Sequence, residues 1–269
     1  MFDLAVSTNA YLGFELDRAL DGIAAAGFRR VELNTSENRA WKYRVNGDMD
    51  DRAFAAVTDA LKLSGLTAAS LCGYGQLALK SRHESFRRLI DVAEAFGCRT
   101  VIQTLDAPED AGETLLTADE LVPVLRQFGD VCQAKGIQLC LELHGAYVTG
   151  AAMGKLVQKV AHPCVHINYD TANGLYYAGV FPYADLADSL GLVGSVHLKD
   201  NRGGQGVWDF PALGDGGIDL KKVLDILSGG TATLVTTEIE YTPAGPRDAA
   251  YADETVARSY RYLHSLGAL

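Results

Sequence analysis

Residues 118–143 read ADELVPVLRQFGDVCQAKGIQLCLEL and contain the unit from which the fold is built. Apolar side chains at helical spacing predict a helix over 118–135, and Gly136 supplies a natural helix stop. The apolar, β-rich run 137–143 that follows predicts a strand. The same order of helix, glycine and strand occurs four times in the first half of the chain. The chain is therefore expected to repeat one α/β unit.

Eight β-rich runs alternate with helical stretches along all 269 residues. The expected strands are 2–8, 30–34, 66–72, 99–104, 137–143, 164–170, 193–199 and 232–239. The expected helices are 16–26, 51–63, 83–96, 118–135, 150–160, 183–190, 219–227 and 248–265. Strands that alternate with helices predict a parallel sheet with right-handed crossovers.

A closed barrel is the most economical parallel sheet for a chain of this length. A doubly wound sheet would need a glycine-rich phosphate turn after its first strand, whereas residues 8–14 read TNAYLGF. Nothing resembles a linker, and the longest irregular stretch, 200–218, is rich in glycine like a functional loop. The expected fold is one α/β domain over 1–269, a single (β/α)8 TIM barrel.

The net charge and the number of cysteines limit the classes of binding partner and the cellular compartments that are expected. The net charge of −10 disfavours nucleic acid and anionic membranes as partners. No apolar run approaches the roughly 20 residues of a membrane span, and residues 1–13 lack the features of a signal peptide. The odd number of cysteines predicts buried free thiols in a reducing, cytoplasmic location. These are Cys72, Cys98, Cys132, Cys140 and Cys164.

Four consecutive expected strands, the fifth to the eighth, each end in an ionisable side chain. These side chains are Glu142, Asp170, His197 and Glu238, separated by 28, 27 and 41 residues. The active site of a barrel forms where its strands end, and alternate strand residues point inward. Each residue should share its face with a second polar group. The expected pairs are Glu142 with His144, Asp170 with Asn168 and His166, His197 with Lys199, and Glu238 with Glu240.

Three carboxylates that converge in an apolar barrel would repel one another and lose hydration. A divalent cation removes this conflict, and three oxygen ligands with one imidazole suit Mn²⁺, Mg²⁺ or Co²⁺. The absence of thiolate ligands argues against a structural zinc site. Any one such residue is more often an ordinary polar group at a barrel mouth, but four together favour a metal site.

Other polar and aromatic residues near the same barrel end allow two interpretations each. Lys199 either bonds a substrate oxygen or forms a salt bridge, for which Asp200 is the adjacent candidate. Glu32 should point inward with Asn34, to contact substrate or a metal ligand, or else to pair with a lysine or arginine.

Trp208 and Phe210 either form a lid on the face of a bound substrate or anchor the glycine-rich loop. The aromatic run 175–183 suits either the substrate pocket or a subunit contact of a homo-oligomer. Among the remaining histidines, His83 and His264 are expected on helix surfaces, and His166 in the core with a hydrogen bond.

Several strings resemble one family. LELHG (141–145), INYDTANG (167–174), VHLKD (196–200), GDGGIDLKKVLDIL (214–227) and TTEIE (236–240) are similar to the sugar isomerase/epimerase superfamily of the xylose-isomerase-like barrel. FDLAVSTNAY (2–11) and GFRRVELN (27–34) extend the resemblance over essentially the whole chain. The superfamily includes ketose 3-epimerases, keto-inositol isomerases and inosose dehydratases.

The resemblance implies a metal site and a reaction. It implies that Glu142, Asp170, His197 and Glu238 bind one divalent metal, commonly Mn²⁺, with Glu240 as the alternative on the last strand. It also implies proton abstraction next to a carbonyl of a sugar or keto-sugar through an enediolate, with Glu142 and Glu238 as acid and base. His144, one inward step beyond Glu142, is the next candidate acid or base.

The chain departs from many ketose epimerases at two places. Asn173, a candidate substrate contact, stands where they carry a second histidine, and His144-Gly145-Ala146 replaces a polar or basic stretch. These departures keep a second outcome open, in which the same enolate expels a β-oxygen. That enzyme would be a lyase or dehydratase acting on a keto-inositol or 3-keto-glycoside.

Two rival functions are disfavoured. An apurinic endonuclease on this barrel needs about three zinc ions and more histidines than the six present. A metal-free binding barrel would be expected to lack one of the four ligands. Phosphorylated substrates are less favoured than neutral sugars, since few cations besides Lys199 and Arg202 fall near the expected mouth.

Overall fold

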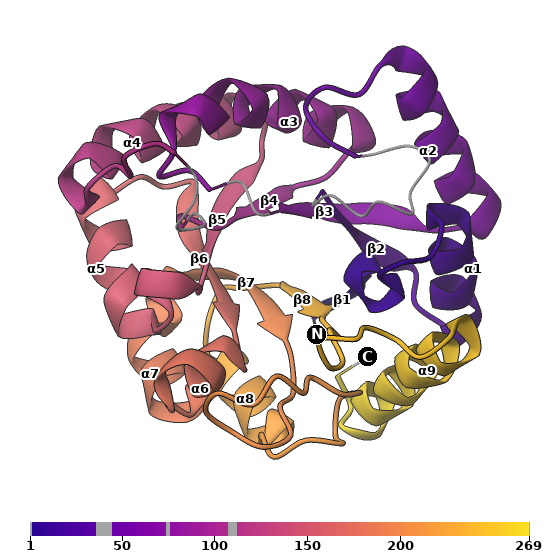
Figure 1. The fold of residues 1–269 in the computed structure, drawn as a ribbon. Helices are drawn as coiled ribbons and strands as arrows, with labels where there is room; N and C mark the ends of the chain where they lie inside the picture. The colour runs from indigo at the N-terminus through magenta and orange to yellow at the C-terminus, as the bar shows by residue number, and fades with distance from the viewer. Residues whose placement is uncertain (1, 36–44, 74–75, 107–111, 269) are drawn as a thin grey trace.

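The computed structural model describes residues 2–35, 45–73, 76–106 and 112–268, and its strands form a closed parallel barrel in the order β1 to β8 (Figure 1). The strands are β1 (Asp3–Ser7), β2 (Arg30–Asn34), β3 (Thr67–Gly73), β4 (Thr100–Gln103), β5 (Gln138–Glu142), β6 (Val165–Asp170), β7 (Val193–Leu198) and β8 (Leu234–Thr237). β1 pairs with β8, which closes the ring. The predicted TIM barrel is confirmed.

Helices surround the barrel on all sides (Figure 1). They are α1 (Leu16–Ala26), α2 (Asp51–Ser64), α3 (His83–Phe96), α4 (Ala118–Ala134), α5 (Gly150–Val160), α6 (Asn173–Ala178), α7 (Pro182–Ser189), α8 (Leu220–Leu227) and α9 (Ala249–Ser265). Short 3-10 helices lie at Thr8–Tyr11, Lys80–Arg82, Gly145–Tyr147 and Leu190–Leu192. Each of the eight predicted helices is present, and α6 is an additional short one.

The helix ends follow the local signals in the sequence. α4 begins with a capping box, in which Thr117 and Glu120 bond each other's backbone N–H groups. α1 is capped at its carboxyl end by Gly27, whose φ of 110° belongs to the left-handed region that favours glycine. A Cβ at Gly27 would also lie 2.8 Å from the Tyr260 ring, so the close packing of α1 on α9 requires glycine there.

Two layers of packing hold the barrel. The larger apolar core lies between the sheet and the helices and includes outward-facing strand residues such as Leu33, Val101 and Leu139. Inside the barrel, small clusters such as Cys72, Ile102 and Cys140 give way to buried polar side chains toward the carboxyl ends of the strands. This polar inner layer is where the strand-end residues meet.

Four of the five cysteines are buried free thiols, as predicted, while His83 and His166 both differ from their predicted positions. All five cysteines are free thiols; four are buried and Cys164 is half-buried. His264 is exposed, as expected, but the surface position predicted for His83 is wrong. His83 is half-buried, with Nε2 2.9 Å from the Leu77 carbonyl and its ring edge-on to Phe128. His166, expected in the core, is half-buried, with Nε2 3.0 Å from the Pro163 carbonyl. Among the described helices, none has the length and apolar character needed to cross a membrane.

Candidate metal centre

Four buried side chains converge at the carboxyl ends of β5 to β8. Glu142 and Asp170 are the last residues of β5 and β6, His197 lies near the end of β7, and Glu238 directly follows β8. One ligand atom from each lies within 4.8 Å of those from the other three. The structure thus brings together the four residues that strand spacing singled out, and we call them the carboxylate–histidine cluster.

The two ring nitrogens of His197 face different groups. Nδ1 lies 3.3 Å from Oε1 of Glu142 and 3.4 Å from Oε2 of Glu238. Nε2 lies 3.3 Å from Oε2 of Glu32, within hydrogen-bonding distance. Nδ1 is therefore the nitrogen that is turned toward the carboxylate–histidine cluster.

The backbone leaves one oxygen of Asp170 free to bind a cation. Oδ1 accepts hydrogen bonds from the N–H groups of Ala172, at 2.7 Å, and Asn173, at 2.8 Å. Oδ2 is buried and has no hydrogen bond, and the same holds for Nδ1 of His197 and Oε2 of Glu238. Buried polar atoms are normally hydrogen-bonded, whereas these two oxygens have the nearby Lys199 ammonium as an ion partner instead. Three such atoms that face one another fit a cation.

Lys199 lies inside the same site. Its Nζ lies 2.6 Å from Oε2 of Glu240, 3.2 Å from Oε2 of Glu238 and 3.5 Å from Oδ2 of Asp170. It also lies 4.4 Å from the centre of the Phe210 ring. One ammonium thus offsets part of the charge of three buried carboxylates.

The suggested salt bridge between Lys199 and Asp200 is wrong, because successive residues of an extended chain point to opposite faces. The Asp200 carboxylate instead accepts N–H bonds from Gly214, Gly216 and Ile218. It therefore ties the two ends of the loop 200–218 together.

Burial and neighbouring charges shift the pKa values of Asp170 and Glu238 in opposite directions. Burial raises the pKa of Asp170 to about 7, with Lys199 opposing the rise and the carboxylates of Glu238 and Glu142 adding to it. Burial would also raise the pKa of Glu238, but the charges of Lys199 and His197 hold that pKa well below its usual range. Without a cation, the site thus disfavours three ionised carboxylates side by side.

Glu32 is buried behind His197. Besides contacting Nε2, its Oε2 accepts a hydrogen bond of 2.8 Å from the Ser70 hydroxyl. Its ionic partner is thus the histidine rather than the lysine or arginine considered from the sequence. Cys72 lies beside both residues, with one ligand atom of each of the three within 4.8 Å of the others, and sequence reasoning missed it.

A small, narrow pocket adjoins the carboxylate–histidine cluster. It is lined by Glu142, His144, Asn173, Tyr177, Lys199, Trp208, Phe210 and Glu240. Asn173, predicted to contact substrate, donates its side-chain N–H to the Leu143 carbonyl at 2.9 Å and accepts from Lys199 at 3.4 Å. One face of the pocket is charged and the other is aromatic.

The aromatic face comes from the loop 200–218 and α6. Trp208 and Phe210 pack edge-on against each other and against Tyr176. The N–H of Gly206 donates to the Tyr176 carbonyl, which holds the loop on α6. Trp208 therefore anchors the loop and also lines the pocket, while its suggested role as a lid on a sugar stays a prediction.

His144 connects two residues that sequence reasoning did not single out. Its Nδ1 lies 2.7 Å from Oδ2 of Asp106, and its Nε2 lies 2.8 Å from the Tyr177 hydroxyl. Asp106 follows the end of β4, so the strand-end argument used for the four later strands could have found it. Tyr177 lies in the aromatic run 175–183, which the sequence assigns to a substrate pocket or a subunit contact without singling out one residue.

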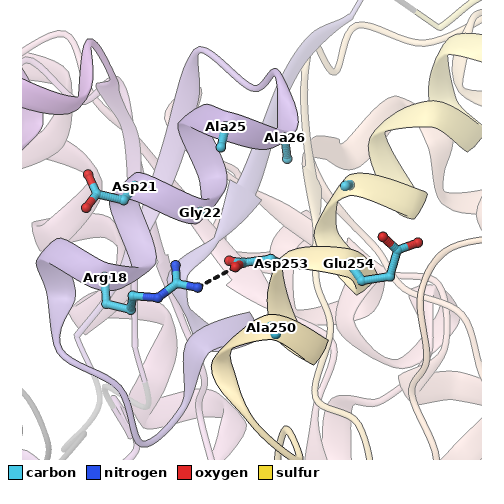
Figure 2. Close-up of a pocket in the computed structure, with 9 residues that line it drawn as sticks. Arg18, Asp21, Gly22, Ala25, Ala26, Ala250, Asp253 and Glu254 are labelled. Carbon is cyan, nitrogen blue, oxygen red and sulfur yellow. Dashed lines mark hydrogen bonds and ion pairs between the residues drawn. The ribbon is translucent and has the colours of Figure 1, made fainter.

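A separate groove lies outside the barrel between α1 and α9 (Figure 2). An ion pair between Arg18 and Asp253 crosses it, and alanines from both helices line it. It contains none of the residues of the carboxylate–histidine cluster or its pocket.

Comparison with known proteins agrees with this architecture. A Xylose isomerase-like TIM barrel protein from Mycobacterium smegmatis in complex with magnesium has a TM-score of 0.76 at 16% identity, over 99% of this chain and 98% of that one. A D-psicose 3-epimerase gives 0.76 at 16% identity over 99% of both chains. The IOLI protein with a bound zinc atom gives 0.76 at 17% identity, over 100% of this chain and 99% of that one.

Identities this low establish the fold alone, and no curated protein sequence matches the chain. The family described as Xylose isomerase-like TIM barrel, in contrast, matches residues 20–261 directly. A match over this length, together with the closed barrel, shows that the chain belongs to the Xylose isomerase-like TIM barrel family.

Proposed function

We propose that the protein is a divalent-metal-dependent sugar isomerase or epimerase that moves a proton next to the carbonyl of a ketose or keto-sugar. The observation that carries this proposal is the buried carboxylate–histidine cluster of Glu142, Asp170, His197 and Glu238. Three carboxylates and one imidazole suit Mn²⁺, with Mg²⁺ and Co²⁺ as alternatives. Neighbours of the same fold are a D-psicose 3-epimerase and an L-ribulose 3-epimerase, which supports the choice of reaction.

The bound cation and the surrounding side chains would have different roles in the reaction. A divalent cation held by the four residues would act as a Lewis acid toward the substrate carbonyl and favour the enediolate. Glu142 and Glu238 approach from β5 and β8, so they can reach a bound sugar from two sides. One carboxylate removes the proton from the carbon beside the carbonyl, and the other returns a proton to that carbon or its neighbour.

The charges of the pocket favour a neutral sugar over a sugar phosphate. Lys199 is the cation among the described residues that line the pocket, and three carboxylates already surround it. A phosphate dianion placed there would compete with Glu238 and Glu240 for the same ammonium. Hydroxyl groups can instead bond Lys199, Glu240 and Asn173, while Trp208 offers an aromatic surface to the sugar's C–H face.

A lyase or dehydratase is the second candidate, and exposed apolar side chains near the pocket support it. Tyr177, which lines the pocket, is 37% exposed, and Val207, the neighbour of Trp208 in the loop, is 43% exposed. A ring attached to a 3-keto-glycoside could pack on such side chains while its keto-sugar occupies the pocket. Loss of the attached group after proton abstraction would then replace the return of the proton.

The two outcomes are separated by incubating the Mn²⁺-loaded protein in D₂O with ketoses, keto-inositols and 3-keto-glycosides. Isomerase or epimerase activity predicts deuterium in the recovered sugar and a new isomer, measured by NMR. Lyase activity predicts an unsaturated product and a released group. Asp170→Asn is the matched control, since it should remove either signal while changing one atom. Inertness of the wild-type protein toward every compound would refute the proposal.

A further inference from the structure

Three side chains from three separate elements form one hydrogen-bonded row along the wall of the pocket. Asp106 follows β4, His144 follows β5, and Tyr177 lies in α6. The row runs from the Asp106 carboxylate to Nδ1 of His144, at 2.7 Å, and from Nε2 of His144 to the Tyr177 hydroxyl, at 2.8 Å. We call it the Asp106–His144–Tyr177 row. None of the three belongs to the carboxylate–histidine cluster.

The backbone around the row is shaped to allow it. Gly145 has a φ of 54°, in the left-handed region, and a Cβ there would lie 2.9 Å from Cβ of Asp106. Glycine at this position thus lets the Asp106 side chain come close enough to bond His144. The Tyr177 ring packs edge-on against His144, with centroids 5.0 Å apart, and against Tyr176, at 4.6 Å. Ring packing and the hydrogen bond with His144 therefore both fix the position of the Tyr177 ring.

The Asp106–His144–Tyr177 row holds the Tyr177 hydroxyl in one position beside the aromatic face of the pocket. A carboxylate at Nδ1 requires a proton on that nitrogen, so His144 has Nε2 for its contact with the phenol. A phenol that has one hydrogen bond with His144 still has capacity for another. Both Tyr177 and His144 line the pocket beside Glu142. The remaining capacity of the phenol is thus available to a ligand in that pocket.

We infer that Tyr177 is a specificity-determining residue whose phenol bonds one hydroxyl of a neutral sugar, and that Asp106 and His144 are positioning residues that hold this phenol in place. The inference rests on the proposed function, because it needs a sugar in the pocket. It adds the point of recognition, a hydroxyl that is not part of the reacting carbonyl unit. A site built to bond a hydroxyl discriminates against the analogue that lacks it.

The test compares a turned-over ketose with its monodeoxy analogues. The wild-type enzyme should prefer the parent sugar to one particular analogue by about tenfold in kcat/KM, the order of one hydrogen bond. Tyr177→Phe should abolish the preference for that hydroxyl and leave the preferences for the others. Tyr176→Phe is the matched control, since it removes a neighbouring phenol oxygen and keeps the ring. Unchanged discrimination in Tyr177→Phe overturns the inference.

The positioning role of Asp106 has to be tested with a measurement that a general loss of stability would not change. Asp106→Ala should reduce the same single-hydroxyl preference, and Asp106→Asn should restore it, because the amide oxygen also accepts from Nδ1–H of His144. Both variants should bind Mn²⁺ in the same ratio as the wild type. If Asp106→Ala keeps the full preference, Asp106 does not position Tyr177.

A binding measurement separates this inference from the proposed function and covers a variant that folds poorly. In ¹⁵N-histidine-labelled, Mg²⁺-loaded wild-type protein, the parent sugar should shift the Nε2 resonance of His144, and the deoxy analogue should shift it less. A wild-type protein that processes no sugar refutes the proposed function and the inference with it. A wild-type protein that is active but shows equal shifts for both sugars refutes the inference alone.

Discussion

Nε2 of His197 lies 3.3 Å from Oε2 of Glu32, while Nδ1 of the same ring lies 3.3 Å from Oε1 of Glu142. Glu32 is itself held by the Ser70 hydroxyl at 2.8 Å. When a cation binds one nitrogen of a histidine, the other nitrogen keeps its proton and donates it to a neighbouring carboxylate, which fixes the orientation of the ring. The strand-two residue Glu32 thus sets the orientation of a strand-seven ligand from across the barrel.

Replacement of Glu32 should weaken metal binding without removing a proposed ligand. Glu32→Gln retains the size of the side chain but removes the charge that orients His197, and such outer contacts contribute about 10–100-fold in metal affinity. Titration calorimetry with Mn²⁺ measures the change. Equal affinity of the variant and the wild type would show that His197 is held by other groups.

The choice between the two glutamates after β8 can be made with a pair of isosteric variants. Glu238→Gln should abolish stoichiometric Mn²⁺ binding, because Oε2 of Glu238 faces the other ligands. Glu240→Gln should keep stoichiometric Mn²⁺ binding, since Glu240 contacts Lys199 at 2.6 Å and lies outside the carboxylate–histidine cluster. Metal analysis of the two purified variants decides the assignment, and the reverse result would transfer the ligand role to Glu240.

Metal should stabilise the folded chain. A cation that binds only the folded state adds about 2.7 kcal/mol when its concentration is 100 times the dissociation constant. Thermal unfolding should therefore shift upward by several degrees on addition of Mn²⁺ and return after chelation with EDTA. Asp170→Asn should show little of this shift, because the oxygen that faces the cation is lost. An equal shift in the variant would place the stabilising cation elsewhere.

The loop that carries the aromatic face should depend on one buried carboxylate. Asp200→Ala removes the acceptor for the N–H groups of Gly214, Gly216 and Ile218. Only the Ile218 bond among the three is fully buried. A buried donor left unsatisfied costs about 1–3 kcal/mol, so the free energy of unfolding should fall by at least about that amount. Urea unfolding measures this loss, with the exposed Asp225→Ala as the control. Equal midpoints for the two variants would mean that the loop is held without Asp200.

The fold was predictable because its signals are local. Helix stops such as Gly27 and the capping box at Thr117 act within a few residues, so the expected ranges and the observed helices agree closely. The short helix α6 was missed although a signal for its start is local. The Asp170 carboxylate accepts hydrogen bonds from the N–H groups of Ala172 and Asn173, two and three residues further along the chain.

The proposed ligand set was also predictable, since alternation along parallel strands places strand-end residues on one side of a barrel. The contacts between elements were not. The bond of His144 to Asp106 and Tyr177 joins β4, β5 and α6, and no spacing in the sequence encodes that meeting. The same limit applies to Lys199, whose partners lie on neighbouring strands rather than at the next position.

By itself, the sequence determined the alternation of strand and helix, the closed barrel and the four strand-end residues that face one another. Only the tertiary structure decided which nitrogen of His197 faces the carboxylates, which groups Lys199 touches, and that Asp106 and Tyr177 hold His144. The physical reason is the distance along the chain over which each interaction acts. Periodicity and capping depend on neighbours within one or two helical turns, whereas hydrogen bonds across the barrel depend on how all eight strands are placed together.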